Sequence, residues 1–208
     1  MHVKLIPLVF VLFINTNALA LSLELALGET EQAPLIAGNS GEEVTENTFT
    51  FKASYEFHPT WNIETAYEYY AQGADTYLTD SEGIINEAVT SSAIFLGLRK
   101  SYILTDRFAV NVRLGYSTWN INYDIEFEDH AADFSYADSG STLYWGLGAE
   151  FYFTPRFYIT AGYTQLTMEI RQPEESIQSD NISNLVLNVD SDRENEIGNL
   201  SFGIGYIF

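Results

Sequence analysis

The sequence predicts an all-β protein, an eight-stranded antiparallel up-and-down β-barrel that crosses a membrane. Three observations predict this class. Apolar residues recur at every second position in eight separate segments, as they do in strands whose two faces meet different surroundings. The connections between these segments are short and long in turn. No segment after residue 20 has the roughly 20 consecutive apolar residues that a spanning helix needs.

The chain begins with a predicted secretory signal peptide, residues 1–20. Lys4 supplies a positive charge, residues 5–14 form an apolar run, and Ala18-Leu19-Ala20 fits a cleavage site. These three parts in this order are typical of export signals. We therefore expect an exported mature chain, residues 21–208, that forms the barrel. An uncleaved N-terminal anchor is the alternative.

The first four predicted strands lie near residues 21–28, 49–57, 61–70 and 93–99. Leucines alternate with other residues in the first, aromatic residues dominate the second and third, and branched apolar residues mark the fourth. Such residues favour a pleated surface with one apolar face. The end of the fourth strand is open, because the segment from Tyr102 to Leu104 either extends it or begins the next turn.

The last four predicted strands lie near residues 108–117, 142–153, 157–164 and 200–208. Valine, leucine and aromatic residues alternate there with Gly, Ser, Thr and a few charged residues. Together with the first four segments they give an even number of strands, as bacterial outer-membrane barrels require.

The predicted connections differ sharply in length. Residues 58–60, 105–107 and 154–156 form short ones that contain Pro or Asp, which favour tight turns. Residues 29–47, 71–89, 120–140 and 169–198 form long ones. In an up-and-down barrel all short turns then meet at one end and all long loops at the other, which is the plan of an outer-membrane barrel.

Composition narrows the function classes. The 208 residues include 14 Tyr and 14 Phe but no Cys, and the formal net charge is -20. The absence of Cys excludes a disulfide framework and a thiolate metal site. An acidic chain is a poor partner for nucleic acid, because phosphate contacts need clustered Lys and Arg.

Each predicted strand has one apolar face and one polar face. A narrow barrel with a polar interior needs a non-aqueous exterior, so we expect the apolar face to contact lipid. The polar face carries eight charged residues that would lie in the lumen: Glu24, Lys52, Glu56, Glu64, Glu68, Arg99, Arg113 and Glu150. Buried charges must be paired or hydrated, so we interpret this set as a structural plug. Rearrangement of the pairs into a narrow path is the alternative, and the excess of acid would make that path prefer cations.

Aromatic residues cluster near the strand ends, and we expect two interfacial girdles. The short-turn girdle would comprise Phe57, Trp61, Phe108, Phe153, Phe157 and Phe208. The long-loop girdle would comprise Tyr67, Tyr69, Tyr116, Trp119, Tyr144, Trp145 and Tyr163.

Three segments resemble strands of the OmpA-like family of small outer-membrane barrels: LGYSTW at 114–119, DSGSTLYWGLGAE at 138–150 and LSFGIGYIF at 200–208. The resemblance implies a barrel interior filled with ion pairs and hydrogen bonds. It also implies that Phe202, Ile204, Tyr206 and Phe208 form the signal read by the barrel-assembly machinery. Longer members carry a peptidoglycan-binding domain after the barrel; this chain ends at Phe208, so we expect no tether to the cell wall.

Candidate catalytic residues are few. Barrel enzymes that transfer or hydrolyse acyl groups need a histidine base beside a serine or an acid. His58 lies in a short turn next to Pro59, whereas His130 lies in a long connection near Asp129 and Ser135. We therefore expect no enzymatic activity, with a lipid-modifying enzyme based on His130 as the remaining alternative.

The long connections are rich in acid, including Glu29, Glu31 and Glu46 in the first. Carboxylate clusters can hold Ca²⁺ or Mg²⁺, but no spaced calcium-loop pattern is present, so we expect a hydrated surface without metal or cofactor.

These observations lead to one functional expectation: a monomeric, non-enzymatic outer-membrane barrel that supports envelope integrity and presents acidic extracellular loops. Its expected partners are outer-membrane lipids and lipopolysaccharide, with the barrel-assembly machinery during biogenesis. The alternative from a different class is a narrow cation-preferring channel.

Overall fold

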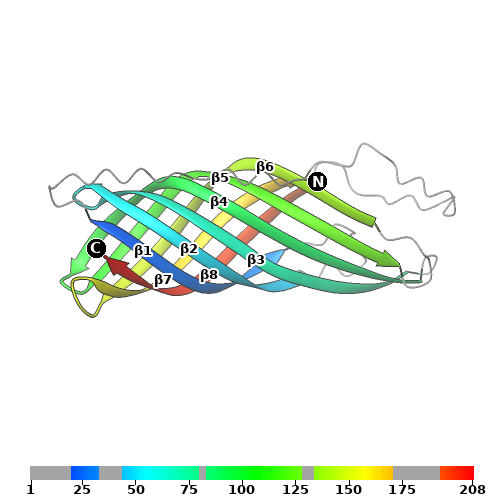
Figure 1. Ribbon diagram of the computed structural model, residues 1–208, viewed down its shortest axis with the longest axis horizontal. Coiled ribbons are helices and arrows are strands. Elements are labelled where there is room, and N and C mark those ends of the chain that lie inside the picture. Colours follow the sequence, from blue (N-terminus) through cyan, green and yellow to red (C-terminus); the bar gives the residue numbers. More distant parts are fainter. Residues whose placement is uncertain (1–19, 33–43, 80–82, 128–133, 171–192) are drawn as a thin grey trace.

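The computed structural model describes residues 20–32, 44–79, 83–127, 134–170 and 193–208. These residues form eight antiparallel strands that close into one barrel in sequence order (Figure 1), so the predicted fold class is confirmed. The strands are β1 (Leu21–Gln32), β2 (Val44–His58), β3 (Trp61–Thr79), β4 (Gly83–Thr105), β5 (Phe108–Phe127), β6 (Phe134–Tyr152), β7 (Phe157–Ile170) and β8 (Arg193–Ile207). Among the described residues, no helix is long and apolar enough to cross a membrane.

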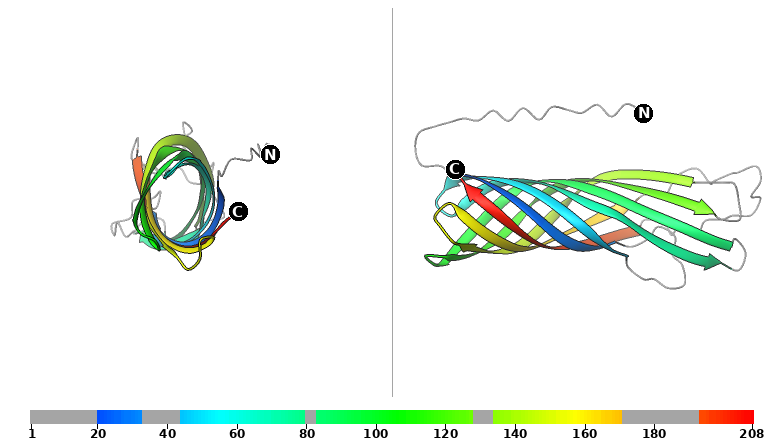
Figure 2. Two further views of the ribbon diagram at one scale, coloured as in Figure 1. Left: turned by 90° about the vertical axis from the view of Figure 1, so that its left-hand side faces the viewer. Right: turned by 60° about the horizontal axis from the view of Figure 1, so that its bottom comes forward.

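The first and last strands close the barrel by pairing with each other. Their register runs from Ser22 opposite Ile207 to Glu31 opposite Gly198, and the two strands lie side by side in Figure 2. The pairing extends to the end of the chain, where the amide of Phe208 donates a hydrogen bond of 2.9 Å to the carbonyl of Leu21. Closure matters because an unpaired strand edge cannot be satisfied in hydrocarbon.

Three tight turns lie at one end of the barrel, where the sequence predicts them. Thr60, between β2 and β3, has a φ of 70°, which is uncommon for a residue with a side chain. Its conformation is held by β4: Nζ of Lys100 donates to Oγ1 of Thr60 at 2.6 Å, and the amide of Ser101 donates to the Thr60 carbonyl at 2.8 Å.

The strands are longer than the sequence analysis predicts at the other end. Much of the predicted connection 71–89 belongs to β3 and β4, and much of 120–140 belongs to β5 and β6. The segment from Tyr102 to Leu104 belongs to β4, which settles the open end of that strand. With 20 residues, β5 is about twice as long as a spanning strand of roughly 9–11 residues. Strands β3, β4, β5 and β6, with 19 to 23 residues each, therefore continue well beyond a bilayer, and Figure 1 shows them reaching furthest at the end opposite the tight turns.

The two faces of β5 exchange their character along its length. From the tight turn to Tyr116, apolar side chains point outward, and Leu114 is 61% exposed. Beyond Tyr116, the outward positions are polar, as at Thr118 and Asn120, and apolar side chains such as Ile121 point inward and are buried. The first part is built for lipid outside and polar groups inside, and the second part is built for water outside and an apolar core inside.

Other strands show a similar boundary, because in four of the eight strand pairs the last apolar outward residues are directly opposite each other. These pairs are Leu27 with Phe49, Phe49 with Tyr69, Tyr116 with Leu143, and Tyr163 with Leu200. We take this line as the outer limit of the hydrocarbon.

Inside the barrel, an apolar core begins near that line and continues beyond it. It comprises Ala66, Tyr70, Val89, Ala93, Phe95, Trp119, Ile121, Tyr123, Ile125, Tyr144, Leu166, Met168 and Ile197. Two of these residues, Trp119 and Tyr144, are assigned by sequence to the outer aromatic girdle, and that assignment is wrong. Both occupy inward positions of their strands, and the aromatic ring of Tyr144 packs edge-on against Phe95 with centroids 4.8 Å apart. We call this set the apolar core below.

Candidate functional site

Seven of the eight charged residues predicted for the lumen are buried inside the barrel. They come from six strands: Glu24 from β1, Lys52 from β2, Glu64 and Glu68 from β3, Arg99 from β4, Arg113 from β5 and Glu150 from β6. Each lies at an inward position of its strand, because side chains alternate between the two faces. The eighth, Glu56, is half-exposed near the tight turns.

Lys52 and Glu24 form the simplest pair. The two residues are directly opposite each other in the β1–β2 register. Nζ of Lys52 donates to Oε1 of Glu24 at 2.9 Å, and both side chains are buried. A cross-strand pair of opposite charge is the arrangement that a sheet favours at such positions.

Two arginines form a larger network with two glutamates. Nη1 of Arg99 donates to Oε1 of Glu150 at 2.9 Å and lies 3.9 Å from Oε2 of Glu64. Nε of Arg113 lies 3.3 Å from Oε1 of the same Glu64. Arg99 and Arg113 are directly opposite each other in the β4–β5 register, so Glu64 and Glu150 offset a repulsion between like charges.

Neutral side chains complete the network around Glu150. Asn111 on β5 donates from Nδ2 to Oε1 at 2.9 Å, and the hydroxyl of Tyr152 donates to Oε2. A glycine on β6 leaves space for the amide: a Cβ at Gly148 would lie only 2.7 Å from Oδ1 of Asn111. Sequence analysis does not single out these residues, although their inward parity and the glycines on β6 are visible in the sequence.

Glu68 differs from Glu24, Glu64 and Glu150, which each face a Lys or Arg. Its Oε2 accepts hydrogen bonds from the hydroxyl of Tyr70 at 2.9 Å and from Nδ2 of Asn199 at 3.1 Å. Neither donor is charged, and Glu68 makes no ion pair with the basic side chains that the structure describes. Asn199 and Tyr70 are likewise not singled out by sequence analysis.

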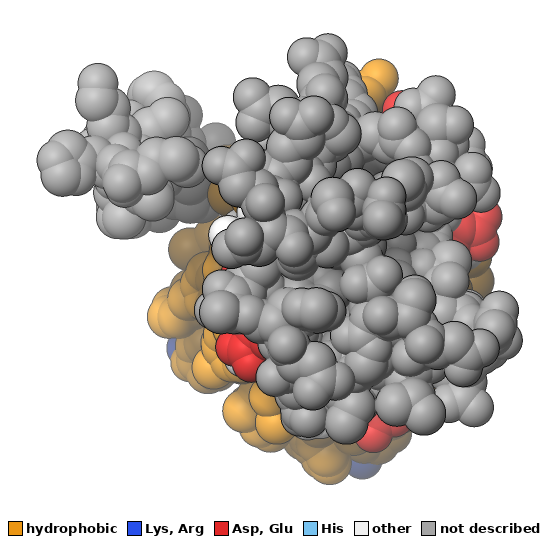
Figure 3. Space-filling model, turned by 90° about the vertical axis from the view of Figure 1, so that its right-hand side faces the viewer, with side chains coloured by type: hydrophobic (Ala, Val, Ile, Leu, Met, Phe, Trp, Pro, Cys, Tyr) orange, Lys and Arg blue, Asp and Glu red, His pale blue; other side chains and the backbone are white. Residues whose placement is uncertain are grey.

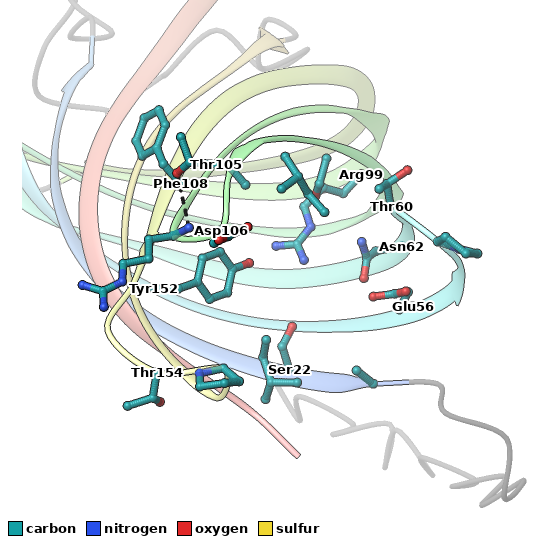
Figure 4. Close-up of a pocket in the computed structure, with 18 of the residues that line it drawn as sticks. Ser22, Glu56, Thr60, Asn62, Arg99, Thr105, Asp106, Phe108, Tyr152 and Thr154 are labelled. Atoms are coloured by element: carbon teal, nitrogen blue, oxygen red, sulfur yellow. Dashed lines mark hydrogen bonds between the residues drawn. The ribbon is translucent and has the colours of Figure 1, made fainter.

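A cavity of about 700 Å³ opens at the end with the tight turns. Figure 4 shows its polar lining, with Ser22, Glu56, Asn62 and Tyr152 around it and the guanidinium of Arg99 pointing into it. The cavity therefore reaches one edge of the ion-pair network. Beyond the network, toward the long-strand end, the interior is occupied by the apolar core.

The long-strand end has an acidic exterior. Glu29, Asp124, Glu126, Glu169 and Glu196 are exposed there on described strands, and acidic side chains are visible at the rim in Figure 3. Described Lys and Arg side chains lie instead in the lumen or near the tight turns. Sequence analysis places Glu46 in a loop with these acids, but it lies on β2 and is buried.

The described residues do not bring together a catalytic group or a metal site around the candidates from the sequence. His58 is exposed in its turn, with Nδ1 3.2 Å from the carbonyl oxygen of Pro59, and His130 lies outside the described residues. Most acids of the long connections also lie outside them. Within the described part of the chain, no three His, Cys, Asp or Glu residues are placed to hold a metal ion together.

The proposed assembly residues line the lipid face of the last strand. Phe202, Ile204 and Tyr206 point outward from β8, and Phe208 follows it with an exposed side chain. Tyr206 and Phe208 pack edge to face, with centroids 4.9 Å apart. This places an apolar, aromatic stripe at the closing seam of the barrel.

Comparison with known proteins gives one family match. A family model described as the outer membrane protein beta-barrel domain matches residues 15–208. A search of curated proteins finds no match.

Solved structures with the same fold are distant in sequence. Ail, the attachment invasion locus protein of Yersinia pestis, was solved with the heparin analogue sucrose octasulfate; it is 16% identical, with a TM-score of 0.54, covering 91% of this chain and 99% of Ail. Neisserial surface protein A is 12% identical, with a TM-score of 0.53 and coverage of 91% and 99%. The N-terminal β-barrel domain of OprF from Pseudomonas aeruginosa is 13% identical, with a TM-score of 0.53 and coverage of 91% and 97%. At these identities the likeness concerns the fold alone.

Proposed function

The chain belongs to the outer membrane β-barrel family, and from that premise we propose that it is a sealed, non-enzymatic barrel that supports the integrity of the envelope. The observation that carries this proposal is the interior, where two barriers follow each other. The ion-pair network around Glu64 and Glu150 fills one section, and the apolar core fills the next. An ion crossing the barrel would have to displace both, and an apolar constriction opposes hydrated ions by dewetting.

The proposal includes an orientation. The tight turns, the first residue of β1 and the last residue of β8 face the periplasm, and the long strands with their acidic exterior face the cell surface, as in outer-membrane barrels generally. Residues 1–20 serve as the cleaved export signal. Phe202, Ile204, Tyr206 and Phe208 present the assembly signal to the barrel-assembly machinery. The barrel is a monomer whose apolar band contacts outer-membrane lipids and lipopolysaccharide.

The integrity role is tested by deleting the gene and measuring sensitivity to detergent and bile salts. We expect the deletion strain to be more sensitive and wild-type complementation to restore resistance. Complementation with an export-blocked form lacking residues 1–20 serves as the matched control and should not restore it. Unchanged sensitivity in the deletion strain would refute the integrity role.

A narrow cation-preferring channel is the second candidate, because the cavity of about 700 Å³ gives access to Arg99 from one end. Planar-bilayer recordings of the refolded barrel separate the two. A sealed barrel remains silent, and Arg113→Ala also remains silent because the apolar core is intact. Discrete cation-selective steps that grow in Arg113→Ala would instead establish a channel gated by the network. A lipid-modifying activity gains no support from the position of His58. It is tested by measuring lipid A acylation in His130→Ala, and unchanged acylation would refute it.

A further inference from the structure

We infer that the barrel interior binds an alkali-metal cation, Na⁺ or K⁺, beside Glu68, between the ion-pair network and the apolar core. The starting point is the carboxylate of Glu68, which is 1% exposed. Glu24, Glu64 and Glu150 each face a Lys or Arg, whereas Glu68 has only the neutral donors Tyr70 and Asn199. Burying a carboxylate without a compensating cation is strongly unfavourable.

Three oxygen atoms near Glu68 lack hydrogen-bond partners among the described residues. They are Oγ1 of Thr48, Oγ1 of Thr50 and Oδ1 of Asn199. The exposed fractions of these residues are 2%, 0% and 1%. Buried polar atoms are normally satisfied, and these three oxygens are free to donate electron pairs to a bound cation.

The strand register brings these oxygens to one place. Thr50 is directly opposite Glu68 in the β2–β3 pair, and Thr48 is opposite Tyr70. All four are at inward positions of their strands. Cross-strand neighbours on one face have Cβ atoms about 4.5–5.5 Å apart, so the two hydroxyls line the wall beside the carboxylate.

Asn199 reaches this wall from β8, across β1. The reach is possible because β1 presents small residues there: Gly28 is opposite Thr48, and Ala26 is opposite Thr50. A Cβ at Gly28 would lie 2.6 Å from Oδ1 of Asn199. The amide oxygen therefore occupies the space over Gly28, on the side of the barrel where Thr48 and Thr50 also point inward.

The donor set specifies the kind of cation. It contains only oxygen atoms, which hard cations prefer, and it carries a single negative charge. Ca²⁺ takes about 6–8 oxygens, usually including several carboxylates, and Mg²⁺ requires near-octahedral geometry. One carboxylate with three neutral oxygens balances a monovalent ion, so Na⁺ or K⁺ fits the site better.

The test is the thermal unfolding of the refolded mature barrel at constant ionic strength in NaCl, KCl or N-methyl-D-glucamine chloride. The organic cation serves as a bulky monovalent control. A ligand that binds only the folded state raises the midpoint with its concentration. We expect Na⁺ or K⁺ to raise the midpoint by about 3–6 °C over the organic cation, with saturation.

Variants locate the effect. Glu68→Gln should abolish the alkali response, Thr50→Val should weaken it, and Thr50→Ser should retain it. Glu24→Gln is the matched control for a lost buried carboxylate, because Glu24 is paired with Lys52; it should lower the midpoint in all three salts and keep the response. Thr160→Val removes an unpartnered buried hydroxyl elsewhere in the lumen and should also keep it.

Direct binding provides a second readout that does not depend on unfolding. ²³Na relaxation should show bound sodium that is displaced by K⁺ in the wild type and is reduced in Thr50→Val but not in Thr160→Val, even if Glu68→Gln fails to fold. Equal midpoints in all three salts, or a full response in Glu68→Gln, would overturn the inference. A response confined to Ca²⁺ or Mg²⁺ would overturn the assignment of a monovalent ion.

Discussion

Replacing Arg113 by methionine should destabilise the folded barrel by about 3 kcal/mol, because it removes the nearer of the two guanidinium groups that face the buried Glu64. Arg113 is 1% exposed, and its Nε lies 3.3 Å from Oε1 of Glu64. Removing one partner of a buried pair typically costs about 3–5 kcal/mol. Two observations favour the lower end. Arg99 remains 3.9 Å from the other oxygen of Glu64, and the guanidinium nitrogens of Arg113 make no hydrogen bonds to the described residues.

The measurement is a urea titration of the refolded barrel, followed by tryptophan fluorescence and analysed by linear extrapolation. The informative comparison is the double variant Arg113→Met with Glu64→Gln, which removes both charges. It should recover about half or more of the loss, because the cost of the single variant arises from an uncompensated charge. A loss below about 1 kcal/mol in the single variant, or simple additivity in the double variant, would refute this account of the network.

Three further predictions follow from the exchange of faces and from the chain terminus. Ile121→Ala should cost about 2–5 kcal/mol, whereas Asn122→Ala, on the outward face of the same strand, should stay within about 0.5 kcal/mol; equal losses in the urea titration would contradict an apolar core there. Since the chain has no Cys, single spin labels can be placed at positions 114 and 120. The label replacing Leu114 should collide mainly with oxygen in lipid and the one replacing Asn120 with aqueous nickel chelate, and the same preference at both sites would disprove the boundary. Phe208→Ser should reduce folded protein in the outer membrane of cells but leave refolding in detergent unchanged, and equal amounts in cells would rule out a role for Phe208 in assembly.

Sequence predicts the lipid-facing part of each strand well. There the apolar residues stay at every second position, which gives them one parity and therefore one face of the strand. In β5 this parity holds from Phe108 to Tyr116. From Trp119 onward the alternation continues through Ile121 and Tyr123, but the apolar residues now occupy the other parity. A prediction that requires one face to remain apolar throughout ends the strand where the phase changes. The alternation itself was present in the sequence, and its change of phase marks where the strand leaves the membrane.

The interior charges were predictable as a set, but only some of their contacts were. Lys52 and Glu24 meet because they are opposite in the simplest hairpin register. Arg99 reaches Glu150 past β5, and Asn199 reaches Glu68 past β1 and β2. Such contacts cross the lumen and depend on how the closed barrel is staggered, which parity along one strand does not determine. Glu56 has the correct parity but lies so near the tight turns that it faces the open cavity instead of the network.

The phase change has a consequence for transport. In the membrane section the interior is polar because the exterior is lipid. Beyond it the exterior is water, and the interior is mostly apolar, with few buried polar residues such as Glu46 and Glu87. A strand that continues straight from one solvent into the other thereby places an apolar core in series with the charged lumen. Removing one charge, as in Arg113→Ala, alters only the first barrier and leaves Ile121, Tyr123 and Met168 packed in the second. If the barrel is sealed as we propose, conduction requires the outer strands themselves to separate, which costs the burial of that core as well as the pairing of the network.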